Sequence, residues 1–191
     1  MAKIPVGTVH GRFQILHNGH MDYILTAKAA CDFLVVGITN PDPTQTAFNA
    51  ANPHRSLPGS NPFSYYERAI MARESLLEQG VPLAEFMMVP MPINKPELIR
   101  NYVPTDATFY LTVFDEWGRT KVRTLESLAL KTVVLYERPL SEKYHNSSDI
   151  RRKIAAGQPW EGDVPRAVAR YIKDNRLDAR IVALLNERQE S

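Results

Sequence analysis

Polar residues that could bind phosphate gather near the start of the chain, where the eleven residues ending at His20 read HGRFQILHNGH. His17 and His20 are three positions apart, so a helix would present both imidazoles on one side of its first turn. Gly19 lies at the expected start of that helix, where N–H groups without helical partners and the helix dipole favour an anion. Gly11 lets the backbone approach a ligand closely, and Arg12 adds a planar guanidinium for another phosphate oxygen. The stretch therefore predicts a polyphosphate site.

Two other interpretations of the histidines stay open at this point. They could be zinc ligands, although no third His, Cys or carboxylate stands at ligand spacing. They could also be ordinary polar residues at a helix start. A Walker-type phosphate loop is excluded, because the chain contains no G-x-x-x-x-G-K-[ST] stretch.

A second candidate for anion binding lies far along the chain, where residues 146–151 read NSSDIR. Ser147 and Ser148 are residue types that cap helices, and Arg151 and Arg152 follow on the same predicted helix. A hydroxyl, helix amides and a guanidinium together suit the β- and γ-phosphates of a nucleotide. The alternative is a capped surface helix whose arginines are solvated.

The elements that must position these residues alternate between strand and helix. A short apolar stretch ends at Gly11 and precedes NGHMDYILTAKAACD, whose apolar residues have helical spacing. Strand candidates follow at 33–39, in EFMMVPMPI, at 107–114 and at 131–137. This order predicts an α/β fold with a doubly wound, five-stranded parallel sheet. In such folds ligands lie beyond the carboxyl ends of the strands, at the topological switch point.

The remaining segments fit one domain over residues 1–191. Residues 40–62 are rich in proline and asparagine and show no periodicity, so they predict a long loop that acts as a lid, binds ligand or is disordered. From about residue 147 the chain is predicted to be helical to its end.

Composition excludes several classes of partner. The formal net charge is only +2, which argues against nucleic acid. No apolar run approaches eighteen residues, so no membrane partner is expected. The single cysteine, Cys31, cannot form an internal disulfide, and the N-terminus lacks the features of a signal peptide. We therefore expect a cytoplasmic protein.

The stretch GRFQILHNGH resembles the first signature of the HIGH-motif nucleotidyltransferase superfamily, and it is most similar to archaeal-type nicotinamide mononucleotide adenylyltransferases. NSSDIR resembles the second signature of that superfamily, with Asn146 where serine is usual. NPFSYYERAIMA and GQPWEGDVPRAV resemble two further stretches of the adenylyltransferases. The similarity spans roughly residues 4–173 and implies a Rossmann-like nucleotidyltransferase fold with C-terminal helices.

The resemblance implies transfer of a nucleoside monophosphate from a nucleoside triphosphate to a small phosphorylated acceptor, with release of pyrophosphate. The implied pair is ATP with nicotinamide mononucleotide, which gives NAD, and Mg²⁺ would accompany the nucleotide while no protein side chain is expected as a metal ligand. The implied catalytic residues are His17, His20 and Arg151. The implied phosphate-binding residues are Gly11, Arg12, Phe13, Gln14, Gly19, Ser147 and Ser148. Because the family is often oligomeric, a homo-oligomer is a further expectation.

Two segments depart from the adenylyltransferase pattern: the loop at 40–60 is longer than in archaeal adenylyltransferases, and LTVFDEWGRTK at 111–121 replaces a stretch that helps to shape the base pockets. These departures favour, as an alternative, a cytidylyltransferase that acts on another phosphorylated or phosphonate molecule. A nucleotide-binding protein without catalysis is a third possibility. Candidate residues for the acceptor or base pocket are Arg68, Asp115, Trp117 and Arg119.

Overall fold

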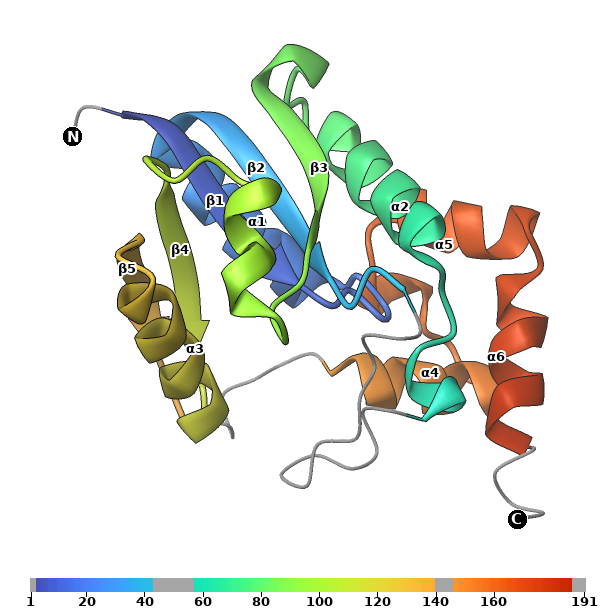
Figure 1. The fold of residues 1–191 in the computed structure, drawn as a ribbon. Coiled ribbons are helices and arrows are strands. Elements are labelled where there is room, and N and C mark those ends of the chain that lie inside the picture. The colour runs from blue at the N-terminus through green and yellow to red at the C-terminus, as the bar shows by residue number, and fades with distance from the viewer. Residues whose placement is uncertain (1–2, 43–56, 140–145, 187–191) are drawn as a thin grey trace.

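The computed structural model of the protein describes residues 3–42, 57–139 and 146–186. Its sheet has five parallel strands in the order β3-β2-β1-β4-β5 (Figure 1). This arrangement confirms the predicted doubly wound sheet. The strands are β1 (Ile4–Gly11), β2 (Cys31–Thr39), β3 (Phe86–Met91), β4 (Thr108–Val113) and β5 (Lys131–Glu137).

The helices lie between the strands and after them, as the sequence pattern predicts. The α-helices of the described residues are α1 (Asn18–Ala29), α2 (Tyr65–Glu78), α3 (Glu116–Ser127), α4 (Ser147–Ala155), α5 (Arg166–Asp174) and α6 (Leu177–Asn186). Short 3-10 helices occupy Pro58–Ser60, Leu83–Glu85, Pro96–Asn101 and Glu161–Asp163. Of the C-terminal helices, orange to red in Figure 1, α5 packs beside α2, and α6 packs against α4 and α5. Most of the predicted long loop, residues 43–56, lies outside the described residues.

Two apolar cores lie on opposite faces of the sheet. Alternate residues of a strand point to opposite faces, so neighbouring residues Val35 and Val36 of β2 belong to different cores. The larger core packs the sheet against α1, α2 and the C-terminal helices, whereas the smaller one lies under α3 and the 3-10 helix Pro96–Asn101. Burial on both faces explains why β2 is an almost continuous apolar run. No helix in the described ranges is both long enough and apolar enough to cross a bilayer.

The switch point of the sheet lies between β1 and β4. β2 and β3 follow β1 on one side of it, and β4 and β5 lie on its other side. β1 pairs with β4 only at Gly7–Thr108 and Thr8–Phe109, although β1 continues to Gly11. The two strands therefore separate at their carboxyl ends, where a doubly wound sheet binds ligands.

His10, near the end of β1, is buried in an apolar setting. It lies on the same face of the strand as Val6, which packs against the smaller core. Among the described residues neither of its ring nitrogens has a hydrogen-bond partner. Burial, with a smaller contribution from the positive charge of Lys121, lowers the pKa of His10 to about 3. The imidazole is therefore neutral throughout the physiological pH range.

This burial makes the free energy of unfolding depend on pH. Between pH 6.5 and 3 the unfolded chain binds a proton at His10 that the folded protein does not, so stability falls as the pH is lowered through that window. The loss at pH 5 relative to pH 7.5 is expected to be about 2 kcal/mol. Denaturant unfolding at pH 5 and at pH 7.5 measures this loss in the free energy of unfolding. In the His10→Leu variant, the part of the loss that comes from His10 is expected to be absent. An equal acid loss in both proteins would contradict the assignment.

Candidate active site

His17 and His20 begin α1 and cap it with each other. His17 is the N-cap residue, and its Nδ1 accepts a hydrogen bond from the backbone N–H of His20 at 3.2 Å. In return the Nδ1 of His20 accepts from the backbone N–H of His17 at 3.4 Å. The two rings stack with centroids 3.6 Å apart and planes inclined by 14°. This reciprocal cap places both imidazoles side by side at the helix N-terminus, as the spacing predicts.

The cap also fixes which ring nitrogen can donate. Since each Nδ1 accepts a backbone hydrogen bond, each neutral ring carries its proton on Nε2. The ring of His17 is buried and that of His20 is half-buried. The site can therefore present two neighbouring N–H donors, at a helix end whose dipole already favours negative charge.

The second candidate for anion binding, residues 146–151, packs directly against the loop that precedes His17. Ser147 donates its hydroxyl to the carbonyl oxygen of Ile15 at 2.9 Å. Arg151 donates from Nη1 to the carbonyl oxygen of Gln14, and from Nη2 to the Oγ of Ser148 at 3.0 Å. Arg151 and Gln14 are 137 positions apart in the sequence. The fold thus brings the two signature segments together, and it places the guanidinium against the loop that leads to His17.

The start of α4 shows why only one of its two arginines belongs to this cluster. Asn146 caps the helix by accepting from the N–H of Ser148 at 3.0 Å, so asparagine serves where the family usually has serine. Arg151 is only 3% exposed, whereas Arg152 extends into solvent and pairs with Asp149. The interpretation as a surface helix with solvated arginines therefore holds for Arg152 and fails for Arg151.

Gly11 and Phe13 shape the loop between β1 and α1. A Cβ atom on Gly11 would lie 2.4 Å from the ring of Phe13, so glycine is required here by a contact within the chain itself. Phe13 has a positive φ of 52° and is 1% exposed. Its ring meets His20 edge-on, with centroids 5.1 Å apart. The Phe13 side chain therefore supports His20 from the core, and any contact from Phe13 to a phosphate would come from its backbone.

Gln14 and Arg12 join this loop to the segment before α2. The Gln14 side chain donates to the carbonyl oxygen of Phe63 at 2.8 Å and accepts from its N–H at 2.9 Å. Arg12 donates from Nη1 to the Oδ1 of Asn61 at 3.4 Å. The buried amide of Gln14 thus serves to hold the loop, while Arg12 stays half-buried at its rim.

Arg68, a predicted residue of the acceptor or base pocket, lies beneath the loop, and its contact with an acceptor or base stays a prediction. Its guanidinium is 2% exposed and donates to backbone carbonyl oxygens at the ends of two strands and at the start of its own helix: those of Arg12, Thr39, Asn40 and Ser64, at 2.7–3.1 Å. Burial lowers the pKa of Arg68 to about 10. The residue therefore ties together the carboxyl ends of β1 and β2, and it acts on the site through the backbone.

Arg68→Met is expected to lower the free energy of unfolding by about 3 kcal/mol, because it leaves several buried carbonyl oxygens without a donor. Chemical denaturation measures this loss. Arg73→Met is the matched control, since Arg73 lies on the same helix but its side chain is 42% exposed. Similar losses for both variants would contradict the role of Arg68.

The candidates at the start of α3 lie beside the switch point, because α3 follows β4. Asp115 caps the helix by accepting from the N–H of Gly118 at 2.8 Å. Trp117 is half-buried in the first turn. Arg119 is exposed and pairs with Glu137 and Glu116. Asp115 and Arg119 thus have structural partners, and a contact of these residues with a base or acceptor stays a prediction.

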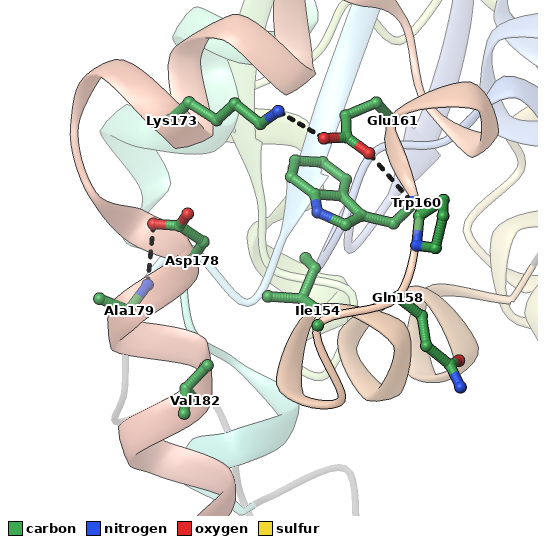
Figure 2. A pocket seen from close by; sticks show the side chains of 10 residues that line it. Ile154, Gln158, Trp160, Glu161, Lys173, Asp178, Ala179 and Val182 are labelled. Atoms are coloured by element: carbon green, nitrogen blue, oxygen red, sulfur yellow. Dashed lines mark hydrogen bonds and ion pairs between the residues drawn. The ribbon is translucent and has the colours of Figure 1, made fainter.

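A separate open hollow of about 570 Å³ lies among the C-terminal helices. Figure 2 shows the ring of Trp160 facing it, between Ile154 and the ion pair of Lys173 with Glu161. The hollow is at the far end of α4 from Ser147 and includes no residue of either signature. The candidate active site is therefore the cluster at the histidines, and this hollow is separate from it.

Residues 8–153 match the family model described as cytidylyltransferase-like. The chain belongs to this family. Its relatives include cytidylyltransferases and adenylyltransferases, and the chain is a nucleotidyltransferase. The resemblance of its two signatures to the HIGH-motif superfamily is thereby confirmed.

Two relatives illustrate the range of this cytidylyltransferase-like family, and one solved structure shares the fold. A phosphonoformate cytidylyltransferase from Streptomyces viridochromogenes is 45% identical over 93% of this chain and 95% of its own. A nicotinamide-nucleotide adenylyltransferase from Pyrococcus furiosus is 30% identical over 97% of this chain and 92% of its own. A bifunctional NMN adenylyltransferase/ADP ribose pyrophosphatase from Francisella tularensis has the same fold, with a TM-score of 0.68 at 16% identity. The match covers 98% of this chain but only 54% of the Francisella protein, so this chain spans about half its length.

Proposed function

We propose that this nucleotidyltransferase moves a cytidylyl group from CTP to a small phosphonate acceptor and releases pyrophosphate. The observation that carries the proposal is the 45% identity, over almost the whole chain, to a protein named phosphonoformate cytidylyltransferase. The adenylyltransferase relatives, whose names point to ATP and nicotinamide mononucleotide, are 28–30% identical. The cytidylyl alternative therefore replaces the adenylyl function as the leading hypothesis.

The proposed reaction is attack by an anionic acceptor oxygen on the α-phosphorus of CTP. A new bond forms between that oxygen and the α-phosphorus, and the bond to the oxygen that bridges the α- and β-phosphates breaks, so pyrophosphate carries away the electron pair. Because a phosphonate is already anionic near neutral pH, the site needs no strong general base. Its task is to align the reactants and to stabilise the negative charge that develops.

Each group of the candidate active site has a proposed role in this reaction. The Nε2–H groups of His17 and His20 donate to oxygens around the α- and β-phosphates, where charge develops. Arg151 supplies a positive charge that the contacts with Gln14 and Ser148 hold in place beside the leaving pyrophosphate. The N-terminus of α1 adds its dipole to the same region.

Mg²⁺ is proposed to enter with the nucleotide. Imidazole N–H groups, backbone amides and a guanidinium suit phosphate oxygens, and they do not suit a hard cation. Among the described residues no three side chains of His, Cys, Asp or Glu come together as a ligand set. The metal would thus be held by phosphate oxygens and water, where it neutralises charge on the triphosphate.

Pyrophosphate release tests the proposal. The protein is incubated with each of the four ribonucleoside triphosphates in turn, against phosphonoformate, other small phosphonates, phosphate monoesters and nicotinamide mononucleotide. Mass spectrometry then identifies the product. CTP with a phosphonate is expected to react fastest and to give a CMP conjugate.

ATP with nicotinamide mononucleotide as the fastest pair, with NAD as product, would overturn the cytidylyl assignment and restore the adenylyl one. A reaction of CTP with a phosphate monoester alone would overturn only the acceptor class. A His20→Glu variant prepared in parallel controls for contaminating enzymes.

A further inference from the structure

Tyr23 of α1 bridges the two strands that separate at the switch point. Its hydroxyl accepts a hydrogen bond from the backbone N–H of His10 in β1 at 3.2 Å. The same hydroxyl donates to the carbonyl oxygen of Tyr110 in β4 at 2.6 Å. Tyr23 is 6% exposed, so this bridge lies inside the protein.

The hydroxyl stands where the parallel ladder would have its next hydrogen bond. The pairs Gly7–Thr108 and Thr8–Phe109 set the register, and continuing that register places His10 opposite Leu111. In a parallel ladder, alternate residues of a strand bond to the same neighbouring strand, so His10 follows Thr8 as the next residue of β1 that faces β4. The N–H of His10 would then donate directly to the carbonyl oxygen of Tyr110. The tyrosine oxygen is inserted between these two groups, and the direct pairing of β1 with β4 ends there.

One inserted oxygen has a geometric consequence. A direct ladder bond would hold the nitrogen and oxygen about 2.9 Å apart. The relay replaces it with two successive hydrogen bonds, and so it holds the strands apart at their carboxyl ends. This is the edge of the sheet from which β1 leads to His17 and β4 leads to α3.

We propose that Tyr23 is a positioning residue whose hydroxyl sets the width of the crevice between β1 and β4, in which the transferred nucleotide lies. The identity of the ligand rests on the proposed nucleotidyl transfer, whereas the separation of the strands rests on the hydrogen bonds of Tyr23. Burial raises the pKa of Tyr23 above its ordinary value, so the hydroxyl keeps its proton and continues to donate to Tyr110. Both hydrogen-bonding roles of the hydroxyl are thus used in separating the strands.

Tyr23→Phe in the full chain tests this role. Without the oxygen, the N–H of His10 is expected to bond directly to the carbonyl of Tyr110, which narrows the crevice. We expect KM for CTP to rise and kcat/KM to fall about tenfold, because the reacting groups are no longer aligned. The melting temperature is expected to stay close to that of the wild type, since one direct bond replaces the relay. Tyr171→Phe, on α5 away from the switch point, is the matched control and is expected to retain wild-type kinetics.

A crystal structure of Tyr23→Phe decides between positioning and plain structural support. A direct bond from His10 to Tyr110 supports the proposal, and strands that stay apart overturn it. Unchanged kcat and KM overturn it as well, whether or not the melting temperature falls. If the wild type transfers no nucleotide to any acceptor, the proposed function fails, and CTP and ATP binding by calorimetry replaces the kinetic measurement. Weaker binding in Tyr23→Phe than in Tyr171→Phe then supports the crevice proposal, and equal binding overturns it.

Discussion

Replacing His20 with glutamate is expected to abolish nucleotidyl transfer while leaving the melting temperature near that of the wild type. Glutamate three residues after the N-cap accepts the backbone N–H of His17 as His20 does, so α1 keeps its cap. The side chain then offers a carboxylate where the reaction develops negative charge on phosphate. Loss of one donor to such charge costs about 10²–10³-fold in kcat, and the added negative charge raises this cost further. Pyrophosphate release and thermal unfolding measure the two effects separately.

The alanine variant at the same position separates turnover from binding. His20→Ala is expected to lower kcat by about 10²–10³-fold and to change the KM for the acceptor far less, because the imidazole bond is strongest in the transition state. It also removes the reciprocal cap, which costs stability of about 1 kcal/mol. Equal losses in turnover and in acceptor binding would argue against this role for His20.

Arg151→Lys is expected to lower kcat/KM by about 10²-fold and to reduce thermal stability. The lysine ammonium keeps the charge but lacks the planar fork that reaches Gln14 and Ser148 together. The start of α4 would therefore lose part of its attachment to the first signature, and the positive charge would no longer be fixed. Steady-state kinetics and calorimetry measure both changes.

Arg152→Lys is the matched control for that substitution. Arg152 is the next residue of α4, but its side chain is 76% exposed, and among the described residues it pairs with Asp149. Its replacement is expected to leave kcat/KM and stability near wild-type values, since exposed ion pairs contribute little. Comparable losses from both substitutions would show that the loss does not depend on the fixed guanidinium of Arg151.

The residues whose chemistry could be predicted from the sequence are those with a local signal. His17 and His20 stand at helical spacing after a strand, and Asn146 to Arg151 form a cap followed by a basic turn. The apolar run at 131–137 predicts a strand with the bounds that β5 has. Such features depend on residues that are near one another in the chain, so their pattern is visible without the fold.

The residues that escaped prediction, or were assigned a different role, depend on distant partners. Nothing in the spacing of Tyr23 distinguishes an ordinary core residue of α1 from a bridge between β1 and β4. The sequence makes Arg68 a candidate for the acceptor or base pocket, because nothing near it in the chain shows that its guanidinium meets the carbonyl oxygens of Arg12 and Thr39. Gln14 likewise meets Phe63 only in the folded chain. Burial and long-range hydrogen bonds of this kind are properties of the tertiary structure.

The attachment of α4 to the first loop has a consequence for biosynthesis. During translation the histidines of α1 are synthesised early. The guanidinium of Arg151 can bond to Gln14 only after the chain has been extended through α4. A nascent chain that stops short of α4 thus holds one half of the proposed phosphate-binding site without the other half. Catalysis is therefore expected to begin only after the sheet is complete and its late helices have closed onto it.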